Sequence, residues 1–151
     1  MTLQQLDVAT FPCVQNLVME AGEAAAITPR INRDRILSVL HELLKCKAGE
    51  IYVDNIGLPK AVLILNFSDN LIFTAKQCHV LFVYAKPEMR SPEAAMEMIR
   101  VIEQAAEAHG CGEIMASSWC YQQTDTYPDI SALWLRCGYT LQEHTFVKVL
   151  S

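Results

Sequence analysis

The longest regular pattern of apolar positions spans residues 92–109 and predicts an amphipathic helix. Apolar residues recur there at intervals of three and four, which places them on one helix face: Ala95, Met98, Ile99, Ile102 and Ala106. Ser91-Pro92-Glu93 supplies an N-cap, a proline at the first helical position and an acid near the positive end of the helix dipole. Gly110 follows as a residue suited to end the helix.

Two shorter helices are predicted in the first third of the chain, after a short strand at residues 3–8. Thr10 is a candidate N-cap for a helix that begins near Phe11 and ends near Gly22. The second helix has helical spacing of its apolar residues and lysines in its last turn: Ile36, Val39, Leu40 and Leu43, then Lys45 and Lys47.

Apolar runs rich in β-branched and aromatic residues predict the strands. They lie at residues 50–53, 60–67, 71–84, 113–117, 139–142 and 144–150, with a short helix at 130–137 before the last two. The run 71–84 is long for one strand, so a break or bulge is expected near Lys76-Gln77. The polar stretch 119–129 is predicted to be a loop.

The resulting order is β-αα-βββ-α-β-α-ββ. A strand, a helix and a strand around residues 80–117 predict a crossover that makes two neighbouring strands parallel, and the other pairs are expected to be antiparallel. We therefore predict one α+β domain over residues 1–151, with a mixed, mostly antiparallel central sheet and helices on both of its faces.

Composition narrows the class of protein. With 52% hydrophobic and 19% charged residues among 151, the chain is typical of an ordered globular domain. The net charge of −5 argues against nonspecific nucleic-acid binding. The N-terminus lacks the pattern of a signal peptide and no apolar run is long enough to span a bilayer, so a cytoplasmic protein without a membrane partner is expected. A mean hydropathy of +0.17 favours a homodimer.

The six cysteines and four histidines form no pattern of metal ligands. The sequence contains no CxxC pair, and the histidines lie far apart, so no metal site is predicted. Without a secretion signal, a disulfide framework is not expected either, and we interpret most of the cysteines as reduced core residues.

The junction between residues 80–84 and the helix that starts at Ser91-Pro92-Glu93 predicts an anion site. The first-turn N–H groups of a helix have no partner within the helix, and the dipole adds partial positive charge. An alternative explains the same residues without a ligand, because Ser91-Pro92-Glu93 is also a favourable helix start.

The same junction resembles the central motif of the GNAT superfamily of acyl-CoA-dependent N-acyltransferases. That motif reads V-x-P-x-x-R-x-x-G-x-G/A, and Pro87, Arg90 and Ala95 match it, whereas Ala85 and Glu93 depart from it. The loop is also similar to the R-G-G-R-A-A loop of small GNAT domains in tailed phages. Residues 130–139 resemble the later A-x-x-L-Y-x-R-x-G-F segment, and residues 146–150 resemble the last strand.

The resemblance implies acetyl-CoA as cosubstrate. Backbone groups at the end of the central strand (Val83, Tyr84 and Ala85) would hold the pantetheine arm and the thioester. The pyrophosphate would lie on the following loop and helix start, at Arg90, Ser91, Glu93, Ala94 and Ala95. Two features oppose it: Pro92 has no N–H, and Glu93 would repel phosphate unless its side chain turns outward.

The resemblance also implies groups that move protons. Trp134 stands where many members have an acidic tyrosine, and an indole N–H cannot serve as an acid. We therefore select Glu113, Tyr121 and Asp125 as catalytic candidates. Other residues that remain open for these roles are His79, Tyr127 and Asp129. A simpler interpretation is a core or surface histidine for His79 and a solvated surface residue for Asp129.

The resulting hypothesis is an N-acetyltransferase in which an amine attacks the thioester directly. The acceptor amine, on a small molecule or a protein, is not identified by the sequence. An alternative is a catalytically inactive GNAT-fold structural or interaction protein of phage origin, and a third is an unrelated α+β binding protein.

Overall fold

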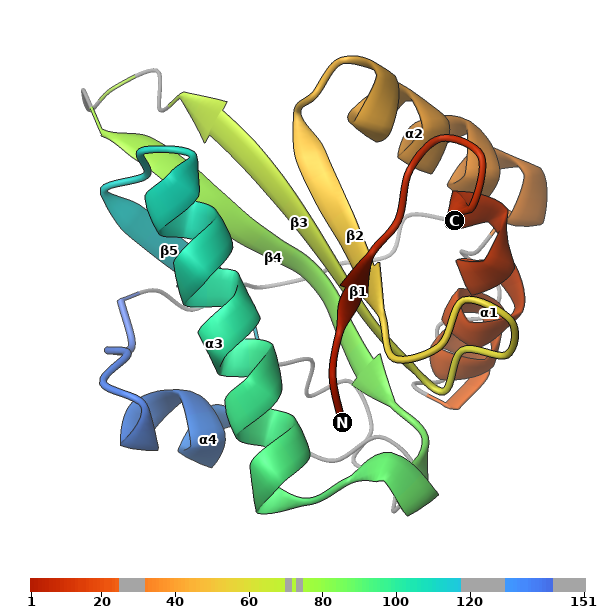
Figure 1. Cartoon of the computed structure of the whole chain (residues 1–151). Coiled ribbons are helices and arrows are strands. Elements are labelled where there is room, and N and C mark those ends of the chain that lie inside the picture. Colours follow the sequence, from red (N-terminus) through yellow and green to blue (C-terminus); the bar gives the residue numbers. More distant parts are fainter. Residues whose placement is uncertain (25–31, 70–71, 73–74, 118–129, 143–151) are drawn as a thin grey trace, which may run out of the picture.

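The computed structural model describes residues 1–24, 32–69, 72, 75–117 and 130–142. Within these residues a five-stranded sheet has the strand order β1-β2-β3-β4-β5 (Figure 1). The strands are β1 (Gln4–Gln5), β2 (Gly49–Val53), β3 (Ala61–Asp69), β4 (Lys76–Ala85) and β5 (Glu113–Ala116). The first four strands pair antiparallel with their neighbours, and β5 pairs parallel to β4. The predicted parallel pair around the crossover is therefore confirmed.

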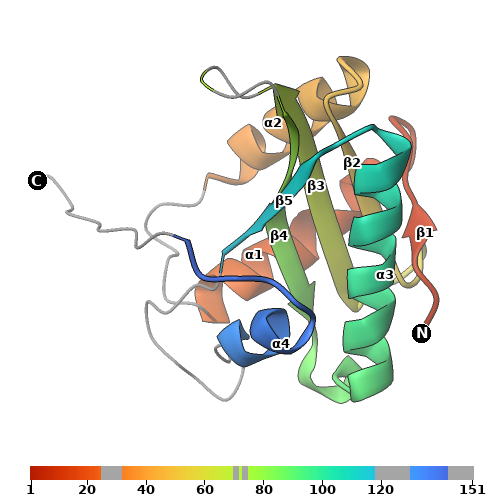
Figure 2. The same ribbon diagram turned by 90° about the vertical axis from the view of Figure 1, so that its left-hand side faces the viewer.

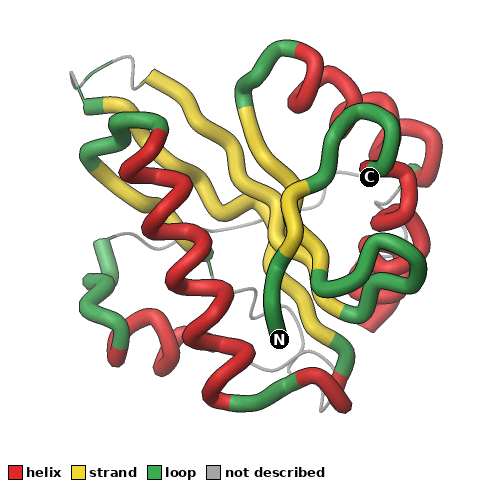
Figure 3. The backbone as a smooth tube through the Cα atoms, viewed as in Figure 1, coloured by secondary structure: helices red, strands yellow, loops and turns green. Residues whose placement is uncertain are grey.

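Helices cover both faces of this sheet (Figures 2 and 3). They are α1 (Gln15–Ala24), α2 (Arg33–Lys45), α3 (Pro92–Ala108) and α4 (Ser131–Arg136), with short 3-10 turns η1 (Phe11–Val14) and η3 (Pro87–Met89). Buried residues of α1, α2 and η1 cluster with one face of the sheet, and those of α3 and α4 cluster with the other. None of the described helices is both long and apolar enough to cross a membrane.

Strand β3 lies at the centre of both hydrophobic cores. Its run of five apolar residues from Ala61 is almost fully buried, and successive side chains point to opposite faces. Ala61, Leu63 and Leu65 belong to the core under α3, while Val62 and Ile64 belong to the core under α1 and α2. A continuous apolar run is therefore the pattern that a strand covered on both faces requires.

Helix α3 begins and ends where its sequence predicts. The Ser91 hydroxyl accepts a hydrogen bond from the Ala94 amide at 3.0 Å, which is the geometry of an N-cap. At the other end His109 is the C-cap, and Gly110 adopts a positive φ of 68° that allows the chain to leave the helix. These local signals fix the residue at which α3 begins, seven residues after β4 ends at Ala85.

The bulge in the long strand lies elsewhere than predicted. Two successive β3 residues pair with β4 residues that are two apart, Ile64 with Phe82 and Leu65 with Val80. Leu81 is therefore the extra residue, and Lys76-Gln77 instead begins the strand. A bulge adds twist, and this one comes at the point where the pairing between β4 and β5 ends.

The predicted strand at residues 139–142 is wrong, because this stretch has no strand pairing in the structure. The Tyr139 amide donates to the Trp134 carbonyl at 3.1 Å, and the two rings pack with their centres 5.1 Å apart. The first residue of this segment therefore hydrogen-bonds to the last turn of α4 instead of to a neighbouring strand. The final predicted strand, 144–150, lies outside the described residues.

Glu97 on α3 holds the N-terminal strand in place. Its carboxylate accepts a hydrogen bond from the Leu3 amide at 3.1 Å and two from the Arg100 guanidinium at 2.8 and 2.9 Å. The hydrogen bonds from Arg100 lower the pKa of Glu97 from its ordinary value of 4.5, and the Leu3 amide acts in the same direction.

This lowered pKa predicts a loss of stability in acid. The carboxylate contributes fully above the unfolded pKa, and the contribution disappears as the pH falls through the lower folded pKa. We expect the free energy of unfolding of the wild-type protein to decrease more between about pH 5 and about pH 3 than that of Glu97→Gln. Urea denaturation across this range measures the difference, and parallel pH dependence in the two proteins would contradict it.

Candidate functional site

A cleft opens where β4 and β5 separate. β5 pairs with only residues 77–80 of β4, and β4 then continues to Ala85 with β3 along its other edge. Figure 2 shows β5 ending while β4 runs on toward the start of α3. The cleft has a volume of about 460 Å³, within the usual range for sites that bind small molecules.

Three parts of the chain build the walls of this cleft. They are residues 80–85 of β4; Arg90, Ser91, Pro92, Ala94, Ala95, Met98 and Ile99 at the start of α3; and Ser117, Ile130, Leu133 and Trp134 around α4. The walls are mainly apolar, and the described lining contains no carboxylate and no imidazole. The described lining therefore suits a ligand with an apolar portion and offers no carboxylate or imidazole as a base.

The backbone at the mouth of the cleft has fewer available donors than predicted. Three of the amides in residues 90–95 are already used: Arg90 donates to the Pro87 carbonyl (3.2 Å), Ala94 to the Ser91 hydroxyl (3.0 Å) and Ala95 to the Ser91 carbonyl (3.0 Å). Pro92 has no N–H. Among the described residues, the amides of Ser91 and Glu93 have no recorded partner, so these two are the donors ready for an anion.

Arg90 adds a positive charge at the same end of the cleft. Its Nε donates to the Ala85 carbonyl at 2.8 Å, and its guanidinium lies 5.7 Å from the centre of the Tyr84 ring. These contacts hold the turn after β4 against the end of that strand. They also mean that the Ala85 carbonyl, expected to contact the ligand, is hydrogen-bonded to Arg90.

Glu93 does not line the cleft. It is exposed and borders a shallow hollow on the outer side of α3, together with residues such as Met96 and Glu103. The side chain therefore turns outward, which is the condition under which the resemblance tolerates an acid at this position. Its amide remains at the helix start, where it can face an anion.

Behind the cleft, α1 is tied to the end of β4. Glu20 accepts a hydrogen bond from the Tyr84 hydroxyl at 3.5 Å and forms an ion pair with Lys86 at 3.0 Å. Burial raises the pKa of Tyr84, and the Glu20 carboxylate raises the pKa of Lys86. The Tyr84 side chain belongs to the core under α1 and α2, so this residue reaches the cleft through its backbone.

The three predicted catalytic residues are not brought together in the described structure. Glu113 is the first residue of β5 and accepts a hydrogen bond from the Gln77 side chain at 2.8 Å. Ser117, which does line the cleft, lies four residues further on, or about 13 Å along an extended chain. The geometry thus gives no support to Glu113 as a base. Tyr121 and Asp125 lie outside the described residues.

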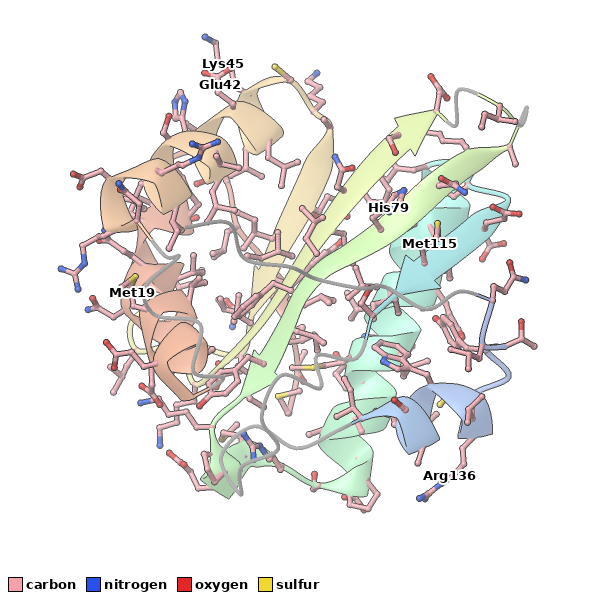
Figure 4. All side chains as sticks on the ribbon, turned by 180° about the vertical axis from the view of Figure 1, so that it is seen from behind. Met19, Glu42, Lys45, His79, Met115 and Arg136 are labelled. Atoms are coloured by element: carbon pink, nitrogen blue, oxygen red, sulfur yellow. The ribbon has the colours of Figure 1, made fainter. Side chains whose placement is uncertain are left out.

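His79 also lies away from the cleft. Figure 4 shows it beside Met115, its partner across β4 and β5, and far from Arg136 at the end of α4. Its Nε2 is 3.3 Å from the Gln77 side-chain oxygen. The interpretation as a hydrogen-bonded structural histidine fits this position better than a catalytic one. The other two open candidates, Tyr127 and Asp129, lie outside the described residues.

Trp134 and Tyr139 form an aromatic pair with two hydrogen-bond donors that lack partners. The indole Nε1 and the Tyr139 hydroxyl are buried, and neither has a hydrogen bond in the described structure. Burial raises the pKa of Tyr139 to about 12, with a further contribution from the Glu103 carboxylate. Neither group supplies a proton readily near neutral pH.

The sequence-based selection missed several cleft residues, namely Met98, Ile99, Ser117, Ile130 and Leu133. Met98 and Ile99 are part of the apolar stripe of α3 and look like ordinary core residues in the sequence. Ser117 follows a strand and has no distinguishing pattern. Only the convergence of β4, α3 and α4 reveals that these residues share one cavity.

No protein-family model matches the sequence, and no curated protein matches it. Solved structures do match its fold. They include an aminoglycoside acetyltransferase from an uncultured soil metagenomic sample (15% identity, TM-score 0.68, covering 100% of this chain and 99% of that one). A ribosomal-protein-alanine N-acetyltransferase from Brucella melitensis is also similar (14% identity, TM-score 0.69, covering 99% of this chain and 100% of that one). A third similar structure is a predicted acetyltransferase from Clostridium acetobutylicum, solved with acetyl-CoA (11% identity, TM-score 0.70, covering 98% of this chain and 95% of that one).

These likenesses extend over nearly the whole chain, so the protein has the GNAT fold. The predicted fold class is confirmed: a mixed, mostly antiparallel sheet with helices on both faces. At 11–15% identity the likeness is one of fold. Function has to be argued from the site itself.

Proposed function

We propose that the cleft binds acetyl-CoA and that the protein transfers the acetyl group to an amine by direct attack on the thioester. The observation that carries the proposal is the cleft between diverging β4 and β5, with the α3 N-terminus at its mouth. The fold it shares with acetyltransferases, one of them solved with acetyl-CoA, supports the same ligand.

The described residues fit the two chemically different parts of this ligand. At the mouth, the amides of Ser91 and Glu93, the α3 dipole and the Arg90 charge suit the pyrophosphate. Further in, the edge of β4 at Val83 offers backbone hydrogen-bonding groups to the amides of the pantetheine arm. The apolar walls suit the arm's hydrocarbon segments.

The reaction requires a proton to leave the amine and a thiolate to leave the acyl carbon. The amine nitrogen forms the new bond to the carbonyl carbon and the carbon–sulfur bond breaks. The proton lost by the nitrogen ends on the departing thiolate sulfur, so the products are an amide and the free thiol of CoA. Because the described lining has no carboxylate or imidazole, the amine enters as its free base in this proposal. The cleft contributes positioning and exclusion of water.

Calorimetric titration of the purified protein with acetyl-CoA, CoA and desulfo-CoA tests the proposal. Micromolar binding of acetyl-CoA supports it and justifies a screen of small-molecule and peptide amines for acetyl transfer. No heat of binding at millimolar ligand overturns it, because the cleft would then hold none of the three CoA ligands.

A second candidate function is CoA binding without catalysis, as in a structural or interaction protein. It is favoured by the absence of an acid–base side chain in the described lining and by the buried indole of Trp134. Binding of acetyl-CoA with no acetyl transfer to any member of a broad amine panel would support this second function over the first.

The outward position of Glu93 yields a prediction. Replacing Glu93 by glutamine removes the charge but keeps the amide, so acetyl-CoA affinity is expected to rise by only about two- to threefold, the size of a screened surface interaction. Calorimetry at low and high salt measures it. A rise of about 100-fold would mean that the carboxylate faces the phosphates, contrary to its position in the structure.

A further inference from the structure

The cleft wall contains a hydrogen-bond donor that the folded chain leaves unused. Trp134 is 6% exposed and lines the cleft, and its Nε1 is buried without a partner in the described structure. Buried polar groups in folded proteins nearly always have a partner, because a buried donor without one destabilises the fold. We therefore expect the buried N–H of Trp134 to meet an acceptor on a bound ligand.

The neighbours of the indole do not provide that acceptor. Among the described residues its aromatic partner is Tyr139, whose hydroxyl also lacks a hydrogen bond there. The described residues that line the cleft with Trp134 include Ile99 and Leu133, whose side chains cannot accept, and Met98, whose thioether sulfur is only a weak acceptor and makes no hydrogen bond with the indole. The acceptor is therefore expected on a ligand in the cleft.

The place of Trp134 in the cleft indicates which part of a ligand it meets. The charged end of the cleft is at the α3 start, where Arg90 and the backbone amides of Ser91 and Glu93 lie. Trp134 stands on α4 and belongs to the same core cluster as Met98 and Ile102, which lie beyond the first turn of α3. The indole thus lies inward from the phosphate end, on the side of an elongated ligand that carries its apolar tail.

We propose that the Trp134 indole N–H donates a hydrogen bond to the carbonyl oxygen of the acyl thioester. The inference rests on the proposed function, since it assigns a contact to the same ligand. The indole is a donor only and does not release its proton. Its role is to hold and polarise the carbonyl that the amine attacks, without taking part in proton transfer.

Trp134→Phe tests this assignment, because it keeps an aromatic ring and removes the donor. Acetyl-CoA carries the thioester carbonyl and CoA does not, so the two ligands separate this contact from all others. The variant is expected to bind acetyl-CoA about five- to tenfold more weakly than the wild-type protein, with unchanged affinity for CoA. Its melting temperature is expected to stay equal or rise, because a buried donor without a partner is gone.

Leu135→Ala is the matched control on the same helix. Leu135 is 58% exposed and does not line the cleft, so this variant is expected to bind both ligands like the wild-type protein. If Trp134→Phe binds acetyl-CoA as tightly as the wild-type protein, or loses affinity equally for CoA, the inference is overturned while the proposed function stands. If the wild-type protein binds neither ligand, both are overturned.

Fluorescence gives a second test that does not depend on the folding of the Trp134 variant. The chain has two tryptophans, so Trp119→Phe leaves Trp134 as the only indole emitter. Acetyl-CoA is expected to change the emission of this variant more than CoA does at equal occupancy. Identical changes with the two ligands would overturn the assignment.

Discussion

Replacing Ala95 by glutamate is expected to weaken acetyl-CoA binding by at least about 100-fold, which corresponds to about 2.7 kcal/mol. Ala95 lies in the first turn of α3, lines the cleft and is only partly exposed. A longer side chain there fills space at the mouth, and its carboxylate faces the site where the amides and Arg90 would hold phosphates. Like charges in close contact oppose binding strongly.

Met96→Glu is the control for this variant. It places the same new charge one residue further along α3, on a side chain that is 54% exposed and outside the cleft. We expect its affinity for acetyl-CoA to remain within about threefold of the wild-type value. Calorimetry gives both affinities, and thermal denaturation verifies that the two variants are similarly folded. Equal affinities of the two variants for acetyl-CoA would show that the phosphates do not bind at the start of α3.

Local signals were sufficient to predict the element that positions this site. The apolar spacing within α3, the Ser91 N-cap and the proline after it act within one or two helical turns, so the sequence carries all of the information. The parallel pairing of β4 and β5 was also predictable, because a helix between two strands leaves few other arrangements.

The form of the cleft was not predictable in the same way. It depends on β5 ending at Ala116 while β4 continues, and on a bulge at Leu81 that one strand alone cannot reveal. The same holds for contacts between distant residues, such as the ion pair of Glu20 with Lys86. Glu113 is a candidate base by its side chain, but strand geometry places it at the end of β5 that is remote from the cleft.

The second large effect is expected in the sheet itself, at the glycine that begins β2. A Cβ added to Gly49 would overlap the Leu65 carbonyl oxygen and come within 2.6 Å of Leu43 Cγ. Leu65 lies in the central strand and α2 packs directly over this position, so neither the backbone nor the helix can move without loss of packing. Gly49→Ala is therefore expected to lower the free energy of unfolding by about 2–4 kcal/mol.

Gly57→Ala shows whether this loss comes from the clash or from alanine as such. A Cβ at Gly57 would meet only the Asn55 side-chain oxygen, at an ordinary 3.4 Å, so a change within about 0.5 kcal/mol is expected. Urea denaturation of the two variants measures the difference, and similar stabilities would mean that α2 does not pack closely on β2. Gly49 lies outside the cleft. Well below its melting temperature, Gly49→Ala should therefore bind acetyl-CoA normally, whereas Ala95→Glu should not. The contrast between the two variants separates residues that support the sheet from those that hold the ligand.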